Sequence, residues 1–496
     1  MKVTLINPPN ENELIGNDPV IIKEQQGIYP PLGILYIAAY LRSTGRYELQ
    51  IIDAQADNLT HAEIGERVVE FNPEVVGITA MTFTLLDVKY TINEIRKRCT
   101  AKVVVGGPHV VIYPEETVDP RGLAADYAVI GEGEITFDEL LQAIDAGTAD
   151  KKIWRQERFI EELDKLPFPA RELTPIHKYY SVLAKDTPTT TSFSSRGCPY
   201  VCSFCDRPAL GKGFRSMSAN RVVDEMEWCV NNGIKEVFFY DDTFSVSKKR
   251  VHDICDELKR RGLSYQDSNG KWVSKIYWDI RTRVNVVDEG LLKNMKEAGC
   301  DRIHFGVESG VTRIIKELQK GITNDQVEDA FALCKSLGIK TLAYFMMGNP
   351  TETHEDIVET LNLAKRIKPD FMQMTILSPF PATQIYHRAL KEGIIDKDVW
   401  KEYALNMNED FRPPLWLEKF KRVELENELR WFYRNFYLTP WFIWNTIKEI
   451  RNIGQFIRYA KAGFSLIKMT LVPDSKYREY WTRRKNTLQV LQPRAA

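Results

Sequence analysis

A group of three cysteines within eight residues is the part of this sequence best able to support chemistry. Cys198, Cys202 and Cys205 stand four and three residues apart, directly after a predicted strand. Three soft thiolate ligands this close together suit an iron-sulfur cluster or zinc. A structural zinc site usually takes four protein ligands, but the nearest candidates are Cys229 downstream and His177 upstream. A 4Fe-4S cluster held by three cysteines keeps one iron open, so the missing fourth ligand favours a cluster.

The other five cysteines do not cluster, and we interpret them as buried or reduced thiols. By contrast, the grouping of three cysteines in a reducing compartment indicates metal binding rather than a disulfide. The separate cysteines are Cys99, Cys229, Cys255, Cys300 and Cys334.

The bulk composition is that of a globular protein with several domains. The chain has 496 residues, is 44% hydrophobic and 27% charged, and carries a formal charge of -1. A length of about 150 residues per domain predicts roughly two to four domains. The near-neutral charge gives no field that would attract nucleic acid. The N-terminus lacks the apolar core of a signal peptide, and no run approaches the roughly 18 apolar residues that span a bilayer. We therefore expect a cytoplasmic protein without a transmembrane segment or a nucleic-acid partner.

Apolar runs alternate with helical patterns in the first part of the chain. Five short runs are typical of buried strands separated by helices, which predicts an α/β domain with a doubly wound, Rossmann-like parallel sheet over residues 1–150. Ligands of such sheets bind in the loops beyond the carboxyl ends of the strands. The expected strands are 2–7, 49–54, 75–80, 102–106 and 127–130.

The alternation stops in residues 151–187, which we interpret as a linker stiffened by Pro167 and Pro169. It resumes in residues 188–394 with six strand-helix units. These predict a central partial (β/α)6 barrel of the triosephosphate isomerase type, with its chemistry at the carboxyl ends of the strands. Residues 395–496 lose the strands and predict a helical C-terminal region that serves as a substrate or cover domain. The expected barrel strands are 190–195, 236–240, 275–281, 302–308, 341–347 and 371–377.

The cysteine spacing, with Phe204 just before the last cysteine, resembles the signature of the radical S-adenosylmethionine (radical SAM) superfamily. The resemblance covers about residues 188–390. It implies that Cys198, Cys202 and Cys205 hold a 4Fe-4S cluster and that the amino and carboxylate groups of S-adenosylmethionine bind the open iron. Reduction then splits the cofactor to give a 5'-deoxyadenosyl radical. An external electron donor such as flavodoxin or ferredoxin is also implied.

Three further segments resemble the same family at the ends of expected strands. Asp241 and Asp242 fall where the family often has residues that meet the methionine amino group. Glu308 and Ser309 fall where it approaches the cofactor's ribose and carboxylate, and Met347 lies in the turn near the adenine. Asp242 has a plainer interpretation as a helix cap. The resemblance implies an S-adenosylmethionine site of Phe204, Asp241, Asp242, Glu308, Ser309 and Met347.

Five loops of the front domain carry matching motifs, at residues 7–9, 29–33, 79–82, 106–109 and 131–134. Their order resembles the cobalamin-binding domain that precedes many radical enzymes, a family that includes the anaerobic magnesium-protoporphyrin ester cyclase. Small residues after parallel strands let the backbone approach a flat macrocycle and its nucleotide tail. The resemblance implies a cobalamin site of Asn7, Pro8, Thr79, Met81, Thr82, Gly106, Gly107, His109, Gly131 and Glu132.

One difference from the methyl-carrying cobalamin proteins bears on the cobalt ligand. Those proteins use an Asp-x-His-x-x-Gly loop whose histidine ligates cobalt from below, whereas residues 7–10 of this chain are Asn-Pro-Pro-Asn. A base-off cofactor without a histidine ligand is therefore implied. We expect His109, which follows Pro108, to bond backbone or a cofactor amide rather than cobalt. Glu132 and Glu134 have the alternative role of capping the following helix.

Aromatic and basic residues mix at roughly helical spacing between Trp431 and Met469. We favour a helix that covers the barrel. The sharper alternative is an interfacial surface that admits an apolar or lipid-like substrate, in a protein peripheral to the membrane. The pattern sets Ile447, Ile450, Ile453, Phe456 and Ile457 against Lys448, Arg451 and Arg458.

Together the resemblances predict a cobalamin-dependent radical SAM enzyme, and methyl transfer to an unactivated carbon is the outcome we favour. The deoxyadenosyl radical takes a hydrogen atom from the substrate, methylcobalamin donates its methyl group, and a second S-adenosylmethionine remethylates cobalt. Radical cyclisation or oxidation, as in the porphyrin cyclase, is one alternative. A non-catalytic iron-sulfur carrier or a zinc-stabilised binding module is another. In a third alternative, the front domain binds no corrinoid. The sequence assigns neither a catalytic side chain nor the substrate.

Overall fold

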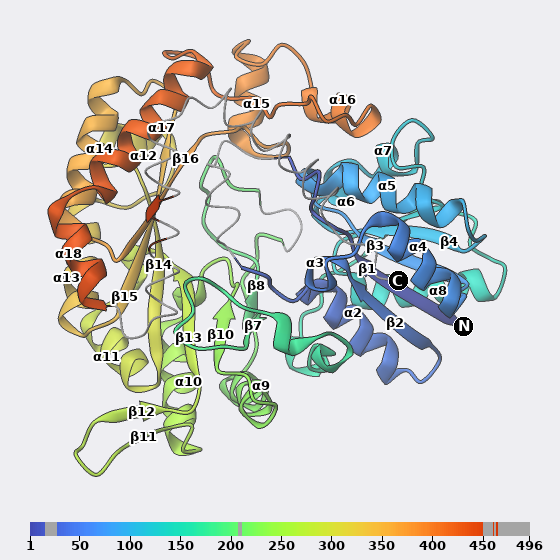
Figure 1. Ribbon diagram of the computed structural model, residues 1–496, viewed down its shortest axis with the longest axis horizontal. Helices are drawn as coiled ribbons and strands as arrows, with labels where there is room; N and C mark the ends of the chain where they lie inside the picture. The colour runs from blue at the N-terminus through green and yellow to red at the C-terminus, as the bar shows by residue number, and fades with distance from the viewer. Residues whose placement is uncertain (15–26, 207–210, 450–459, 461–462, 465–496) are drawn as a thin grey trace.

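Two six-stranded parallel sheets with helices packed against them make up the framework of the molecule (Figure 1). The computed structural model describes residues 1–14, 27–206, 211–449, 460 and 463–464. The front sheet, in blue to cyan, lies beside the barrel sheet, in green to orange. This arrangement confirms the predicted α/β fold class, with a doubly wound domain followed by a partial barrel.

The front sheet has the strand order β2-β1-β3-β4-β5-β6, and all of its pairs are parallel. Strand β6 lies in the stretch that we expected to be a linker. It has only three residues, none of them buried, so it carries no continuous apolar run that would reveal a strand. The strands are β1 (Lys2–Asn7), β2 (Glu48–Asp53), β3 (Val75–Thr79), β4 (Lys102–Gly106), β5 (Tyr127–Ile130) and β6 (Ile153–Arg155).

Helices cover both faces of the front sheet because its buried strands alternate apolar side chains between the two sides. In β4, Val104 packs toward α2 (Leu32–Ser43) and α8 (Gly133–Asp145). Its neighbours Val103 and Val105 pack toward the opposite layer. That layer contains α4 (His61–Phe71), α5 (Leu85–Arg96) and α6 (Pro108–Ile112), and the short helices α3 (Ala54–Asp57) and α7 (Pro114–Val118) complete the domain.

The second sheet runs in chain order, β7-β10-β13-β14-β15-β16, and again all of its pairs are parallel. Within the described residues β7 and β16 do not pair, so the barrel is open, as predicted. The strands are β7 (Thr189–Ser192), β10 (Glu236–Phe239), β13 (Tyr277–Thr282), β14 (Cys300–Glu308), β15 (Lys340–Met347) and β16 (Phe371–Ile376). The connecting helices are α9 (Ala219–Asn231), α10 (Lys248–Arg260), α11 (Glu289–Glu297), α12 (Thr312–Glu317), α13 (Asn324–Ser336) and α14 (His354–Ile367). Two short antiparallel pairs join β8 (Ser195–Arg196) to β9 (Arg215–Ser216) and β11 (Ser264–Gln266) to β12 (Trp272–Ser274).

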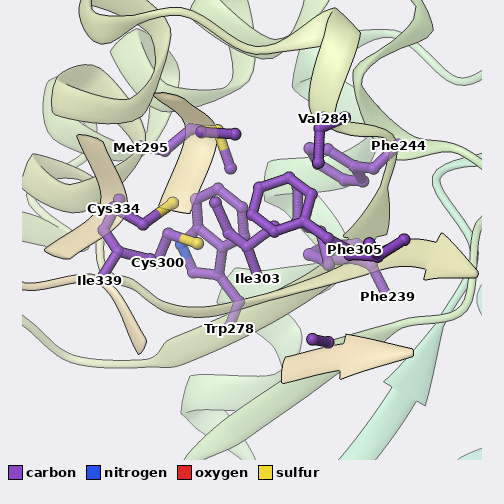
Figure 2. Packing of buried hydrophobic residues seen from close by; sticks show 14 of the residues in the cluster. Phe239, Phe244, Trp278, Val284, Met295, Cys300, Ile303, Phe305, Cys334 and Ile339 are labelled. Carbon is purple, nitrogen blue, oxygen red and sulfur yellow. The ribbon is translucent and has the colours of Figure 1, made fainter. Parts of the chain in front are cut away.

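The core between the barrel strands and their helices is built around Trp278, whose side chain is fully buried (Figure 2). Phe239 and Phe244 pack against it, with ring centroids 6.1 and 5.8 Å away. Cys300 and Cys334 lie in the same core, where burial raises the pKa of the Cys334 thiol to about 12. Such thiols stay protonated and inert, as we expected of the separate cysteines.

The chain after the barrel is helical and contacts both halves of the molecule. Its α16 (Val399–Leu405) packs near α7 of the front domain, where Tyr113 donates a hydrogen bond of 2.8 Å to Asp398. Further on, α17 (Arg422–Tyr437) lies along β16. The remaining helices are α15 (Gln384–Lys391) and α18 (Pro440–Glu449). No helix in the described part of the chain is long and apolar enough to cross a membrane. The predicted tail pattern beyond α18, which includes Ile450, Arg451, Ile453, Phe456, Ile457, Arg458 and Met469, lies outside the described residues.

Two tyrosines of α17 protect the free edge of β16. The Tyr433 hydroxyl lies 3.1 Å from both the N–H and the carbonyl oxygen of Met374. One helical turn later, the Tyr437 hydroxyl lies 3.1 Å from the N–H of Met372 and 2.5 Å from its carbonyl oxygen. A hydroxyl both accepts and donates, so each tyrosine satisfies two backbone groups that the missing neighbour strand would otherwise bind.

Candidate active site

A cavity of about 200 Å³ opens at the carboxyl ends of the barrel strands. All three clustered cysteines lie on its wall, together with polar side chains from β13, β14 and β15. This position matches the expectation that the chemistry of a barrel lies at its carboxyl end. The lining residues are Cys198, Tyr200, Cys202, Phe204, Cys205, Asp242, Thr243, Arg281, Thr282, Arg283, His304, Gly306, Lys320 and Tyr344.

The cysteine loop begins directly after β8, where Gly197 has a φ of 81° that favours glycine. Cys198 and Cys202 are buried, whereas Cys205 is exposed. Arg283 donates a hydrogen bond to the Cys202 sulfur at 3.4 Å. The described residues contain no group of three His, Cys, Asp or Glu side chains that would hold a single metal ion. Three soft sulfur donors on one wall, one of them bonded by a guanidinium, fit an iron-sulfur cluster bound through thiolates.

The two aspartates after β10 have different surroundings. The Asp242 side chain lines the cavity, as does Phe204, so both lie where a cofactor on the cysteine loop would bind. Asp241 is fully buried. Its carboxylate accepts hydrogen bonds from the N–H of Ser194 at 2.7 Å and from the Ser195 hydroxyl at 2.6 Å. Asp241 thus fixes the start of the cysteine loop rather than facing the cavity.

The other predicted S-adenosylmethionine contacts lie behind the cavity wall. Glu308, in a bulge of β14 with a φ of 67°, accepts a hydrogen bond of 2.8 Å from Lys320, whose side chain does line the cavity. A Cβ at Gly306 would lie 2.5 Å from Glu308 Oε1, so glycine leaves room for this ion pair. Ser309 lies 3.2 Å from the hydroxyl of Thr360. Met347 is packed in the barrel core.

The predicted cobalamin residues lie in or beside the loops at the carboxyl ends of β1, β3, β4 and β5. Asn7 donates a hydrogen bond of 2.8 Å to Asp53, and the carbonyl of Pro8 accepts one of 3.1 Å from Gln55. Met81 is 48% exposed. These positions bring Asn7, Pro8, Thr79, Met81, Thr82, Gly106, Gly107, His109, Gly131 and Glu132 to one edge of the sheet.

His109 is buried beneath this edge, with Nδ1 3.2 Å from the Thr82 hydroxyl. Burial lowers the pKa of His109 to about 3, so the imidazole is neutral. Gly107 has a φ of 102°, and a Cβ there would lie 2.8 Å from the carbonyl oxygen of Ala80. A glycine is therefore required for the loop after β4 to pack against the loop after β3.

A buried ionic junction joins the front domain to the cysteine loop. Arg196, two residues before Cys198, lies 2.8 Å from Glu132 and 2.6 Å from Glu134. Arg215 lies 2.9 Å from Glu132. Burial opposes ionisation of Glu132, but the guanidiniums outweigh it and lower the pKa of that carboxyl. Glu132, predicted to contact cobalamin, therefore ties the loop after β5 to the strand that leads into the cysteine motif.

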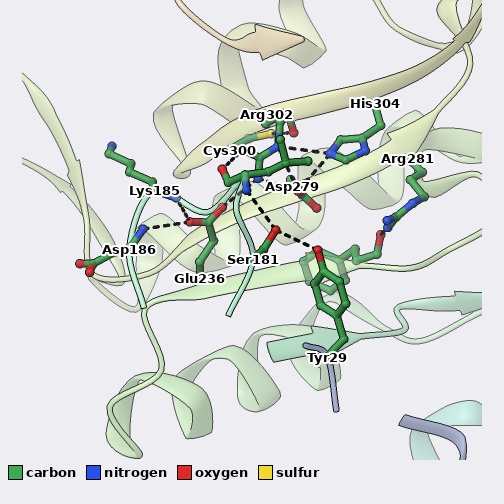
Figure 3. Close-up of polar contacts among 12 residues, drawn as sticks. Tyr29, Ser181, Lys185, Asp186, Glu236, Asp279, Arg281, Cys300, Arg302 and His304 are labelled. Atoms are coloured by element: carbon green, nitrogen blue, oxygen red, sulfur yellow. Dashed lines mark hydrogen bonds and ion pairs between the residues drawn. The ribbon is translucent and has the colours of Figure 1, made fainter. Parts of the chain in front are cut away.

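Apart from Arg281, which the sequence places at the carboxyl end of a predicted strand, sequence reasoning missed the polar side chains inside the barrel. Arg281, His304 and Tyr344 line the cavity, and Asp279 and Arg302 lie close to His304 (Figure 3). Glu236 pairs with Arg302 at 3.1 Å. The two-residue periodicity of a β-strand could have revealed them, since these polar residues alternate with apolar ones along the predicted strands. Charged side chains at alternate positions of a buried strand must face either one another or a ligand.

Two family models match the chain. The model of the radical SAM superfamily matches residues 192–364, and the model of the B12 binding domain matches residues 19–141. These matches cover the cysteine motif with most of the barrel strands and the loops of the front domain, and they confirm both resemblances found in the sequence.

Relatives extend along most of the chain. An uncharacterized methyltransferase of Pyrococcus horikoshii is 35% identical over 89% of this chain and 93% of its own length. The anaerobic magnesium-protoporphyrin IX monomethyl ester cyclase of Rubrivivax gelatinosus is 27% identical over 89% of this chain and 80% of its own. Among solved structures, the cobalamin-dependent S-adenosylmethionine radical enzyme OxsB with aqua-cobalamin bound superposes with a TM-score of 0.67 at 18% identity, covering 94% of this chain and 72% of its own. The OxsB match supports the two-domain α/β fold.

Proposed function

Because the chain belongs to the radical SAM superfamily and carries a B12 binding domain in front of its barrel, we propose that it is a cobalamin-dependent enzyme that methylates an unactivated carbon. The observation that carries the proposal is the shared cavity, which brings Cys198, Cys202 and Cys205 together with Asp242 at the carboxyl ends of the strands. The ionic junction from Arg196 to the front domain supports a reaction that needs both halves of the molecule.

We assign the three clustered cysteines to a 4Fe-4S cluster and the adjoining cavity to S-adenosylmethionine. When bound, these groups supply an organic radical, and cobalamin supplies the methyl group. Arg283 stabilises the Cys202 sulfur as a thiolate through its hydrogen bond. Phe204 and Asp242 are the side chains that contact the cofactor. The remaining predicted contacts, Asp241, Glu308, Ser309 and Met347, shape the wall from behind.

Cobalamin is assigned to the loops at the carboxyl edge of the front sheet. Gly106, Gly107 and Gly131 belong to this edge and shape its loops, since a Cβ at Gly107 would lie 2.8 Å from the carbonyl oxygen of Ala80 and one at Gly131 2.5 Å from Gln156 Oε1. His109 stays neutral beneath the loops and bonds Thr82, which supports our proposal that it does not ligate cobalt. Glu132 and Glu134 bond Arg196 and thereby hold the corrin loops against the cysteine loop.

Two finer assignments complete the proposal. A cluster of this kind needs an outside reductant, for which we propose a flavodoxin or ferredoxin. The substrate is apolar or lipid-like, as the aromatic and basic pattern of the tail suggests; α18 begins at the amino end of β16, away from the cavity, and exposes Ile443, Trp444 and Ile447, which are 45%, 58% and 54% accessible. Such a helix face also suits a protein that lies at the surface of a membrane.

The test is anaerobic reconstitution with iron, sulfide and hydroxocobalamin, followed by incubation with reductant, S-adenosylmethionine that carries a trideuterated methyl group, and a metabolite extract. We expect 5'-deoxyadenosine and a metabolite that has gained the label, both measured by mass spectrometry. Cys202→Ala should abolish both products, whereas Cys99→Ser, at a half-buried cysteine away from the cavity, should not. Purified protein that holds zinc, or wild type that yields neither product, rejects the proposal.

Radical cyclisation or oxidation is a second candidate, favoured by the 27% identity to the ester cyclase of Rubrivivax gelatinosus. In the same assay it predicts 5'-deoxyadenosine together with a product that has lost hydrogen and gained no label. A non-catalytic iron-sulfur protein predicts a cluster without either product.

A further inference from the structure

The barrel interior holds a line of three hydrogen-bonded side chains that starts at the cavity. Tyr344 and His304 line the cavity, on the neighbouring strands β15 and β14. The Tyr344 hydroxyl lies 2.9 Å from His304 Nδ1. On the other side of the ring, Nε2 lies 3.2 Å from Asp279 Oδ2 on β13 (Figure 3). No assignment made so far uses this Tyr-His-Asp line.

The hydrogen bonds give the line a direction. Burial lowers the pKa of His304 to about 4, so the ring is neutral and has one donor and one acceptor nitrogen. The Asp279 carboxylate only accepts, which places the ring proton on Nε2 and leaves Nδ1 to accept from the Tyr344 hydroxyl. Arg302 Nε lies 3.2 Å from Nε2 and 3.3 Å from Asp279 Oδ2, and it donates to the carboxylate because a charged acceptor is the stronger one.

Burial opposes ionisation of Asp279, but His304, Arg302 and Arg281 lower the pKa of its carboxyl, so the far end of the line is a carboxylate. Asp279 Oδ2 receives Arg302 Nη2 at 2.9 Å, while Oδ1 is buried without a hydrogen-bond partner in the described part of the chain. Arg302 also pairs with Glu236 at 3.1 Å, so its charge is shared between two carboxylates. Asp279 therefore keeps negative charge that can stabilise a protonated His304 in a buried site.

Arg281 supplies positive charge at the near end. Its guanidinium lies over the Tyr240 ring at 3.9 Å, donates to the carbonyl of Phe239 at 3.3 Å and lines the cavity close to Tyr344. Among the described residues Arg281 forms no ion pair. An oxyanion beside Tyr344 would thus meet a guanidinium that lies near the Asp279 carboxylate without pairing to it.

We propose that Tyr344 is a catalytic base for a hydroxyl group of the substrate, with His304 and Asp279 as a proton relay behind it. This inference deepens the proposed function of the same site and rests on it. The substrate hydroxyl gives its proton to Tyr344 Oη as Tyr344 passes its own to His304 Nδ1, and the Asp279 carboxylate stabilises the imidazolium that forms. One proton leaves the substrate and one arrives at His304, so no oxidant or reductant is needed.

The proposal specifies a substrate class. The substrate carries a hydroxyl on or beside the carbon to be methylated, and Arg281 binds the resulting oxyanion. A deprotonated hydroxyl weakens the neighbouring C–H bond, which assists removal of the hydrogen atom. Because the relay lies inside the barrel, the hydroxyl end of the substrate points inward and any apolar remainder points toward the mouth.

A first test needs no substrate. Protein with nitrogen-15 in its seven histidines reports by NMR which ring nitrogen of each neutral imidazole carries the proton, and His304→Gln assigns the relevant signals. We expect the His304 proton on Nε2 in wild type. In Asp279→Asn the amide can donate to Nε2, so the proton should move to Nδ1. A wild-type proton on Nδ1, or no change in Asp279→Asn, overturns the relay.

The second test uses the trideuterated methyl assay with a metabolite extract. Tyr344→Phe should lower the labelled product by about 100-fold or more, as expected for loss of an acid-base group. It should keep the release of 5'-deoxyadenosine. Tyr433→Phe is the matched control, since this buried tyrosine also loses a hydroxyl hydrogen bond but lies against β16, away from the cavity.

The outcomes separate the two claims. Undiminished label in Tyr344→Phe, or equal loss of label and of 5'-deoxyadenosine, overturns the relay and leaves the proposed function standing. Wild type that yields neither product rejects the proposed function, and the position of the His304 proton still decides whether the line has the direction that we infer.

Discussion

The buried imidazole of His109 makes the front domain sensitive to acid, and replacing it by glutamine tests this. The pKa of His109 falls to about 3 because the ring is buried, whereas an unfolded histidine titrates near 6.5. Between these values the unfolded chain binds a proton that the folded chain does not. The stability from His109 is therefore present above about pH 6.5 and is lost as the pH falls toward 3.

The magnitude follows from the same two values. Between about pH 7 and pH 5 the linkage relation gives a loss of about 2 kcal/mol from His109 alone, which is roughly a 30-fold increase in the opening constant. Other groups also titrate in this range. Burial raises the pKa of Glu236 and of Glu352 to about 7, and these carboxyls stabilise the folded protein as the pH falls. Their effects cancel when wild type and His109→Gln are compared at the same pH.

The assay is amide hydrogen exchange of β4, whose last residue lies three positions before His109. We expect the opening free energy of wild type, relative to His109→Gln, to fall by about 2 kcal/mol between about pH 7 and pH 5. Comparing the two proteins at each pH removes the intrinsic dependence of exchange on pH. A difference that stays constant over this range would refute the reasoning, because it would mean that His109 carries its proton in the folded state too.

Three other substitutions probe the framework and the cluster. Glu225→Gln should destabilise the protein by about 3 to 5 kcal/mol in urea unfolding, because it removes the buried carboxylate that lies 2.6 Å from Arg171. Trp278→Ala should lower stability by about 3 to 5 kcal/mol in thermal unfolding, since this fully buried ring is the centre of the barrel core. Anaerobically reconstituted Cys198→Ala should bind less iron in metal analysis than Cys255→Ala, at a core cysteine with no contact to the cavity; equal iron in the two would contradict the cluster assignment.

Buried parallel strands were the part of the fold that sequence predicted well. Strand β4 appears with the expected bounds because three successive valines must be covered on both faces. Strand β2 ends one residue earlier than expected, at Asp53, whose side chain caps the short helix α3. Strand β6 escaped prediction because it is short and half-exposed, and only its neighbour β5 makes it a strand.

At the candidate site, only the contacts between residues that lie close together in the sequence could be predicted. The cysteines lie close in sequence and therefore share a loop and a cavity. Asp241 and Asp242 were indistinguishable by sequence, since the choice between them depends on which one meets the hydroxyls of Ser194 and Ser195. The junction from Arg196 to Glu132 joins residues that are 64 positions apart, and only the fold brings them together.

The tyrosine pair on α17 has a consequence for how the molecule behaves at high concentration. A closed barrel has no free margin, whereas an incomplete one offers rows of backbone groups on which a second chain can polymerise. At β16 the hydroxyls of Tyr433 and Tyr437 occupy these groups. The barrel can thus stay open for large cofactors while the backbone groups of β16 remain protected from fibril-like association.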